Sequence, residues 1–173
     1  MLIDLIVVDD VMEALAVRAA LEYWRAQVRM HLIGKASDLV GLMDGSYDLS
    51  DNILLMCHGS KQGFVLPELG KEIADKEPFD RFIGAADIST FLNLNGGLVV
   101  STGCETGTKE FADVFLNSGA NTYIAPNDSP EGDASLMYVL SLFYSLITGK
   151  NIKDAHDKAS VIDQETEMFQ MYV

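Results

Sequence analysis

Several residue types are scarce in this chain of 173 residues, and each scarcity excludes a class of protein. Two cysteines, Cys57 and Cys104, are too few for a disulfide framework or a zinc cage, and they favour a reducing, cytoplasmic setting. Basic residues are also few, because 12 lysines and arginines stand against 26 acids and give a net charge of −14. A chain this acidic repels phosphate backbones and anionic membrane surfaces, so we expect neither nucleic acid nor membrane as a partner.

Other absences exclude further classes of protein. No apolar run approaches the roughly 20 residues that span a bilayer. Residues 1–8 carry an acid and no basic leader, which predicts a first core strand and not a signal peptide. The chain has no Gly-x-x-x-x-Gly-Lys phosphate loop, which leaves nucleotide hydrolysis with little support. No linker, repeat or metal-ligand cluster interrupts residues 1–173, so we expect one domain without cofactor or metal.

Apolar runs rich in β-branched residues alternate with helical patterns along the whole chain. This alternation predicts an α/β fold, a three-layer αβα sandwich with a mostly parallel central sheet. We expect strands at 2–8, 28–33, 53–57, 98–102 and 121–125, and a hairpin near 63–67. We expect helices at 11–25, 36–43, 88–94, 110–117, 132–148 and 152–168.

A thiol and an imidazole follow two of the expected strands. His58 comes directly after the apolar run 53–56, and Cys104 lies just beyond the run 98–100. Parallel strands end at one edge of a sheet, and a cysteine needs a base or cation beside it to be a useful nucleophile. The pattern favours a Cys–His pair, although an inert buried thiol stays open for Cys104. Adjacent strand residues face opposite ways, so we expect Cys57 in the core.

Three glycines accompany these two side chains. Gly59 follows the histidine, and its missing side chain would let a backbone N–H approach a reacting carbonyl. Gly103 and Gly107 flank the cysteine and permit tight turns beside the sulfur. These positions are typical of an oxyanion hole, in which backbone N–H groups bind a developing negative charge.

The order of these motifs resembles that of the caspase-like (clan CD) cysteine peptidases, and most closely that of the CHAT domains. CHAT domains commonly read Leu-Ser-Ala-Cys-Glu-Thr-Gly where this chain has Val-Ser-Thr-Gly-Cys-Glu-Thr-Gly at 100–107. The resemblance covers roughly residues 50–160. The 46 residues from His58 to Cys104 are close to the roughly 50 found in caspases.

The resemblance implies a cysteine endopeptidase that acts on a peptide or protein substrate through a thioester. Cys104 would be the nucleophile and His58 the general acid and base. The backbone N–H groups of Gly59 and Cys104 would bind the oxyanion, as the corresponding groups do in that family. The resemblance says nothing of the oligomeric state or of an activating cleavage, for which the long segment 60–87 offers room.

Substrate preference depends on departures from the family pattern. Caspases have glutamine and metacaspases aspartate two residues before the cysteine, where this chain has Thr102. Caspases also carry an arginine after the first strand that helps to bind acidic side chains, whereas Asp9 and Asp10 stand here. We hypothesise that these residues, with Asp128, form a pocket for lysine or arginine. Asp10 and Glu13 equally fit a helix capping box, and Asp128 a turn.

Two other readings compete with a peptidase. A catalytically inactive caspase-like module could bind a peptide or a protein partner, because a fold does not guarantee an activity. A receiver-like signalling domain is suggested by Asp9 and Asp10 after the first strand. It fails at the third strand, where a phosphoacceptor aspartate is needed and Cys57 and His58 stand instead. The apolar tail 168–173 offers a surface that could cover a partner subunit.

Overall fold

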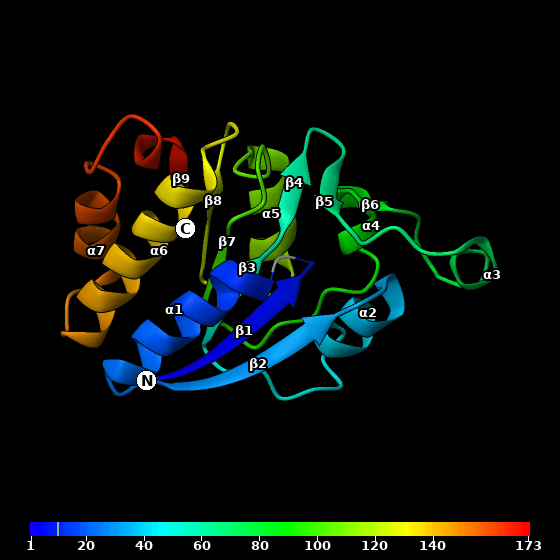
Figure 1. Ribbon diagram of the computed structural model, residues 1–173, viewed down its shortest axis with the longest axis horizontal. Helices are drawn as coiled ribbons and strands as arrows, with labels where there is room; N and C mark the ends of the chain where they lie inside the picture. The colour runs from blue at the N-terminus through cyan, green and yellow to red at the C-terminus, as the bar shows by residue number, and fades with distance from the viewer. Residues whose placement is uncertain (10) are drawn as a thin grey trace.

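A six-stranded sheet forms the centre of the computed structural model, which describes residues 1–9 and 11–173 (Figure 1). The strands lie in the order β2-β1-β3-β7-β8-β9. They are β1 (Leu2–Val8), β2 (Gln27–Ile33), β3 (Asn52–Met56), β7 (Leu98–Ser101), β8 (Thr122–Pro126) and β9 (Phe169–Tyr172). All neighbours pair in parallel except β9, which runs antiparallel to β8.

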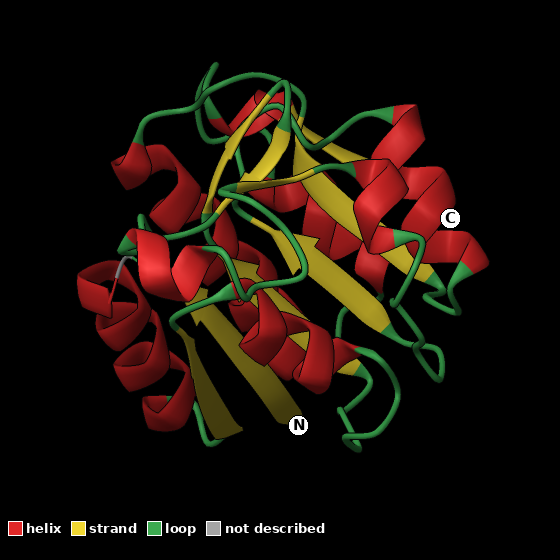
Figure 2. Ribbon diagram, turned by 90° about the vertical axis from the view of Figure 1, so that its right-hand side faces the viewer, coloured by secondary structure: helices red, strands yellow, loops and turns green. Residues whose placement is uncertain are grey.

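Helices cover both faces of this sheet, as Figure 2 shows in cross-section. One face carries α1 (Val11–Tyr23), α6 (Gly132–Ile147) and α7 (Ile152–Ala159). The other face carries α2 (Ala36–Met43), α4 (Ala85–Ile88) and α5 (Lys109–Asn117). The three-layer αβα sandwich with a mostly parallel sheet, predicted from the sequence, is therefore confirmed.

The side chains of β1 explain why the inner strands read as continuous apolar runs. Ile3, Leu5 and Val7 pack into the layer of α1 and α6, whereas Ile6 and Val8 pack into the layer of α2 and α5. All five side chains are buried. A strand covered on both faces favours apolar residues at successive positions, in contrast to a strand with one face in water, and Asp4 is the polar exception in β1.

A second, smaller sheet lies beyond the carboxyl end of β3. It consists of β4 (His58–Ser60), β5 (Gly63–Val65) and β6 (Phe82–Ile83), antiparallel in the order β4-β5-β6. The hairpin expected near 63–67 is wrong in its position, because its turn lies between β4 and β5, and β5 pairs with both β4 and β6. Between β5 and β6 the chain projects from the body and carries the short helix α3 (Lys71–Ala74), as Figure 1 shows.

The last predicted helix, 152–168, is wrong beyond residue 159, where α7 ends. The Asp163 carboxylate accepts the Thr166 N–H at 2.8 Å, and the Asp163 N–H donates to the Thr166 hydroxyl at 3.0 Å. These local bonds satisfy backbone groups that a helix would otherwise use. A 3₁₀ turn, Thr166–Met168, then leads into β9. The apolar tail thus pairs with β8 as an edge strand, with the ring of Phe169 stacked on that of Tyr138 at 3.8 Å between centroids.

Two other helix boundaries differ from the sequence prediction. The helix expected at 88–94 is wrong in position, because α4 ends at Ile88, where the Ser89 and Thr90 hydroxyls donate to carbonyls of its last turn. The first helix ends at Tyr23, before the predicted Arg25. Arg25 has a φ of 70°, in the left-handed region that stops a helix.

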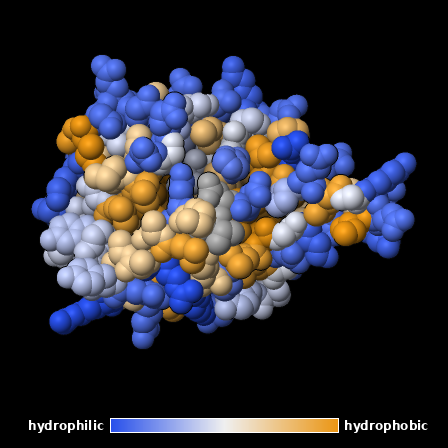
Figure 3. Space-filling view, viewed as in Figure 1, coloured by the Kyte–Doolittle hydropathy of each residue, from blue (hydrophilic) through white to orange (hydrophobic). Residues whose placement is uncertain are grey.

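Apolar side chains are also exposed on the outer face of α1 and α6. Figure 3 shows hydrophobic residues gathered over these two helices. The exposed ones include Met12, Leu15, Met137 and Tyr144. Within the described residues, no helix combines the length and the apolar character that crossing a bilayer requires.

A buried carboxylate ties the edge strand β2 to the rest of the sheet. Asp4 in β1 is fully buried and accepts two hydrogen bonds from the Arg29 guanidinium, at 2.8 and 2.6 Å. Its oxygens also contact the His31 ring at 2.7 Å and accept the Ser50 N–H at 2.6 Å. Burial acts to raise the pKa of Asp4, but Arg29 and the Ser50 N–H outweigh it and lower the pKa from 3.8 to about 2.

We expect Asp4→Asn to lower the free energy of unfolding by about 3 kcal/mol at neutral pH, because it leaves a charged partner without its counter-ion. The folded-state pKa lies below the unfolded one, so this stability is fully present above about pH 4 and is lost as the pH falls towards 2. Urea unfolding of both proteins between pH 2 and 7 measures the difference. Asp51→Asn, at an exposed position, is the control, and an equal effect of both substitutions at pH 7 would contradict the account.

Candidate active site

The two candidate catalytic segments start from neighbouring strands. β3 and β7 pair in parallel, with Leu55 opposite Ser101 at their carboxyl ends. His58 follows β3, as the sequence predicted, and is the first residue of β4. Cys104 follows β7 after two residues. His58 is exposed and Cys104 is half-buried, so both side chains reach the surface at the same edge of the sheet.

A direct backbone contact brings the two segments together. A Cβ added to Gly59 would lie 2.3 Å from the carbonyl oxygen of Cys104 and 2.5 Å from its nitrogen. These distances are shorter than any tolerated contact, so only glycine allows the two chains to approach this closely. The contact places His58 and Cys104 next to touching backbone atoms.

A cavity of about 120 Å³ lies at this junction. His58, Thr102 and Cys104, three of the residues singled out in the sequence, line it together. The other lining residues come from α1, the end of β3 and the start of α6: Glu13, Met56, Cys57, Pro130, Gly132 and Ser135. The cavity therefore opens between the carboxyl edge of the sheet and two helices of one layer.

Thr102 joins the two strand ends. Its backbone N–H donates to Leu55 O at 3.0 Å. Its hydroxyl accepts the Cys57 N–H at 3.1 Å and lies 3.3 Å from the Cys57 carbonyl oxygen, to which it can donate. The hydroxyl of Thr102 is thus committed to backbone groups, which favours a role in holding the site over a role in selecting substrates.

Hydrogen bonds fix the loop on both sides of Cys104. The Gly103 N–H donates to the Ser101 hydroxyl at 3.0 Å, and the Glu105 N–H donates to the Asp128 carbonyl at 3.0 Å. In the described part of the chain, the Cys104 N–H has no acceptor beyond its own residue. Glu105 has a φ of 60°, which a non-glycine residue adopts only when its surroundings hold it there. The loop therefore presents a free backbone donor beside the sulfur.

The thiol of Cys104 is protonated in this environment. Burial raises its pKa, and the nearby charges of Glu105 and Asp128 raise it further, against hydrogen bonding from the Ser129 hydroxyl and the Cys104 N–H. Among the described residues no hydrogen bond joins His58 to Cys104. Catalytic hydrogen bonds are often long before substrate binds, so this geometry is compatible with a base that acts only in a complex.

Cys57 differs from Cys104 because its side chain is buried, as the alternation of side chains along a strand predicted. It is 8% exposed and packs in the core with Phe64 and Phe111. Burial raises the pKa of its thiol to about 12, so a thiolate does not form there at neutral pH.

The three aspartates expected around a substrate pocket do not line this cavity as a group. Asp9 is exposed, has a φ of 75° and is not among the lining residues. Asp10 lies outside the described residues. Asp128 is exposed, contributes its carbonyl to the loop of Cys104, and influences the site through charge.

Among the described residues, Glu13 is the acid that lines the cavity, although its sequence position indicated only a helix cap. Its carboxylate lies against α6, since a Cβ added to Gly132 would be 2.5 Å from Glu13 Oε1. Ser135, 5% exposed, also lines the cavity. The sequence did contain a signal for this role of Glu13. It lies in the first turn of the helix after β1, and ligands bind beyond the carboxyl ends of parallel strands. No cluster of three or more metal-binding side chains occurs among the described residues.

A mostly parallel sheet between two helical layers, with functional loops at its carboxyl edge, is the architecture of the caspase-like cysteine peptidases. Solved structures of gingipain R share it. The complex of Porphyromonas gingivalis RgpB pro- and mature domains matches with a TM-score of 0.61 at 10% identity, covering 97% of this chain and 45% of that one. The Arg-specific cysteine proteinase gingipain R (RgpB) matches with a TM-score of 0.61 at 9% identity, over 96% and 44%.

At this identity the likeness shows the fold, and this chain spans less than half the length of the structures that it matches. No family model matches the sequence. A search of curated proteins likewise gave no match. The closer resemblance to CHAT domains therefore stays an interpretation of the motifs.

Substitution of Gly59 tests the backbone contact. We expect Gly59→Ala to lower the free energy of unfolding by about 1–3 kcal/mol, because the new methyl group overlaps the Cys104 backbone. We also expect a changed rate of Cys104 alkylation by iodoacetamide. Gly70→Ala, whose Cβ would meet nothing within 4 Å, is the control. A stable Gly59→Ala protein with unchanged alkylation would contradict the contact.

Proposed function

We propose that this protein is a cysteine endopeptidase in which Cys104 is the nucleophile and His58 the general base and acid. The observation that carries the proposal is the contact of Gly59 with the Cys104 backbone, which sets both side chains at one cavity. The fold shared with gingipain R, a cysteine proteinase, supports the same conclusion at the level of the class.

In the proposed reaction, His58 takes the proton of the Cys104 thiol as the sulfur attacks the carbonyl carbon of the peptide bond. The resulting oxyanion is bound by the backbone N–H groups of Gly59 and Cys104. The tetrahedral species collapses to a thioester while protonated His58 gives its proton to the leaving amine. Water, deprotonated by His58, then releases the acid product and restores the thiol. Because the resting thiol has a raised pKa, this base is required for the first step.

We further propose that the enzyme cuts after lysine or arginine. A cavity of about 120 Å³ has room for a single side chain, and the carboxylate of Glu13 lies at its wall. A carboxylate in a restricted cavity pairs well with a guanidinium or ammonium group. The net charge of −14 adds long-range attraction for a cationic peptide. Asp9, Asp10 and Asp128 stay candidates for contacts outside the cavity.

A second candidate function is a non-catalytic module that binds a peptide or protein partner. The observation in its favour is the protonated thiol of Cys104, which makes no hydrogen bond with His58 within the described structure. Such a module would keep the cavity and its acid but would not form a thioester.

The peptidase proposal predicts that Cys104→Ala and His58→Ala each lower peptide cleavage by about 10⁴-fold or more. A library of fluorogenic peptides measures this, with circular dichroism to show that both variants fold. Cys57→Ser, at the buried thiol beside the cavity, is the matched control for a lost sulfur, and its folded fraction should keep cleavage within about tenfold of the wild type. Unchanged cleavage in either catalytic variant would refute the assignment of that residue.

The preference for basic residues is tested separately. We expect Glu13→Gln to lower kcat/KM for substrates with arginine before the cut by about 10- to 100-fold, because the bound cation loses its counter-charge. Substrates with leucine at that position should change little. Asp9→Asn is the matched acid outside the cavity, and the same loss in that variant would place the specificity pocket elsewhere.

A further inference from the structure

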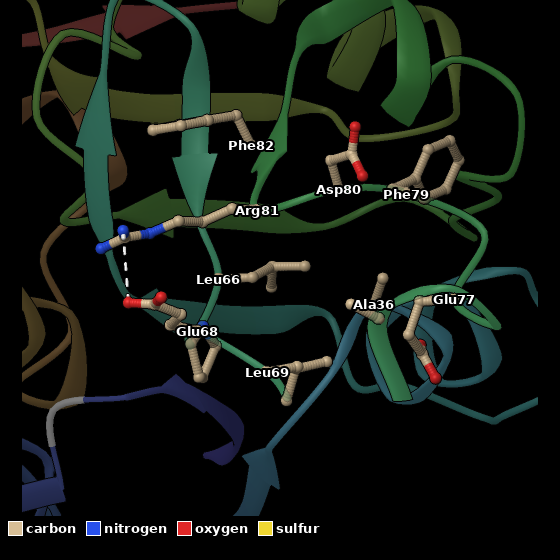
Figure 4. A pocket seen from close by; sticks show the side chains of 11 residues that line it. Ala36, Leu66, Glu68, Leu69, Glu77, Phe79, Asp80, Arg81 and Phe82 are labelled. Atoms are coloured by element: carbon tan, nitrogen blue, oxygen red, sulfur yellow. Dashed lines mark ion pairs between the residues drawn. The ribbon is translucent and has the colours of Figure 1, made fainter. Parts of the chain in front are cut away.

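An apolar hollow beside the small sheet lies away from Cys104. It measures about 380 Å³ and opens between the start of α2 and the projecting segment that connects β5 to β6. Its lining includes Ala36, Leu66, Leu69, Phe79 and Phe82. Figure 4 shows Leu66 and Leu69 on one side of this space and Ala36 and Glu77 on the other.

The projecting segment borders the cavity without filling it. α3 buries none of its residues, and its Ala74 is exposed while it lines the cavity. The segment is held to the body at its base, where the Glu77 carboxylate accepts the Ser37 N–H at 2.7 Å and lies 3.4 Å from Lys35. The cavity is thus a surface feature with fixed walls and an open mouth.

The lining of the cavity carries more acids than bases. Of its lining residues, Glu68, Glu77 and Asp80 are acids and Arg81 is the base. Arg81 lies 4.0 Å from Glu68, the ion pair drawn in Figure 4, and Glu77 is bound to α2. Asp80 is exposed and has neither a hydrogen bond nor an ion pair within the described structure. An apolar ligand with a positive charge is complementary to this site, and one with a negative charge is not.

A strand edge lies beside the cavity. β6 is the outer strand of the small sheet, and its Phe82 lines the cavity. An extended peptide can pair with such an edge while one of its side chains enters an adjoining pocket. Phe82 stands opposite Val65, which in turn stands opposite His58, so the same sheet borders both the apolar cavity and the Cys104 cavity.

We propose that this cavity is a second peptide-binding site, for an extended segment with one large apolar side chain next to a lysine or arginine. The apolar side chain enters between Leu66, Phe79 and Ala36, and the neighbouring base pairs with Asp80. The site does not depend on the peptidase activity, because it requires only binding.

Fluorescence anisotropy with four labelled pentapeptides tests the proposal: Gly-Ser-Phe-Lys-Ser, and versions with Ala for Phe, with Glu for Lys, or with both. The full chain carrying Cys104→Ala is used, so that the probes stay intact, and the wild type is measured beside it. We expect the Phe-Lys peptide to bind about tenfold or more tighter than the Ala-Lys peptide, because burying a phenylalanine gains at least that much. The Phe-Glu peptide should bind more weakly than the Phe-Lys peptide.

Two variants locate the binding. Ala74→Trp places a large side chain in the cavity and should weaken the binding of the Phe-Lys peptide about tenfold. Ile73 lies on the same helix but outside the cavity lining, so Ile73→Trp should leave this binding unchanged. Asp80→Asn should remove the preference for Lys over Glu but keep the preference for Phe over Ala, with Asp75→Asn as its control. Equal binding of Phe and Ala peptides, an unaffected Ala74→Trp protein, or displacement of the peptide by decanoate but not by decylamine would overturn the proposal.

Discussion

The close approach of two backbones, Gly59 against Cys104, is the constraint on which the candidate site depends. It is possible because β3 and β7 are neighbours in parallel register and because residue 59 has no side chain. The committed hydroxyl of Thr102 and the bonds of the Cys104 loop hold the two strand ends in place. The rigid αβα body therefore determines where a sulfur, an imidazole and a free N–H meet, and the loops contribute only local detail.

The surroundings of Cys104 favour the protonated thiol. Burial raises the pKa of Cys104, and the charges of Glu105 and Asp128 raise it further. In the proposed function the same acidic surroundings would attract a cationic peptide, for which Glu13 at the cavity wall is the proposed partner. Under the proposed function, the same acidic surroundings would keep Cys104 protonated in the resting protein and would favour cationic substrates.

The sequence predicted the inner strands and the edge at which His58 and Cys104 lie, because continuous apolar runs and the rule for strand ends are local signals. It did not predict β9, since an edge strand is decided by pairing with β8, far away in the chain. The sequence also did not predict that Glu13 lines the cavity. Its approach to Gly132 results from the packing of α1 on α6, which joins residues more than a hundred positions apart, and a helix-start pattern explained it locally.

A crystal structure of the protein with a peptidyl-arginine aldehyde tests the central claim most directly. The account predicts a hemithioacetal on Cys104, with the former aldehyde oxygen about 3 Å from the backbone nitrogens of Gly59 and Cys104. The arginine side chain should lie in the cavity beside Glu13. An adduct on another residue, or an oxygen directed away from both nitrogens, would contradict the account.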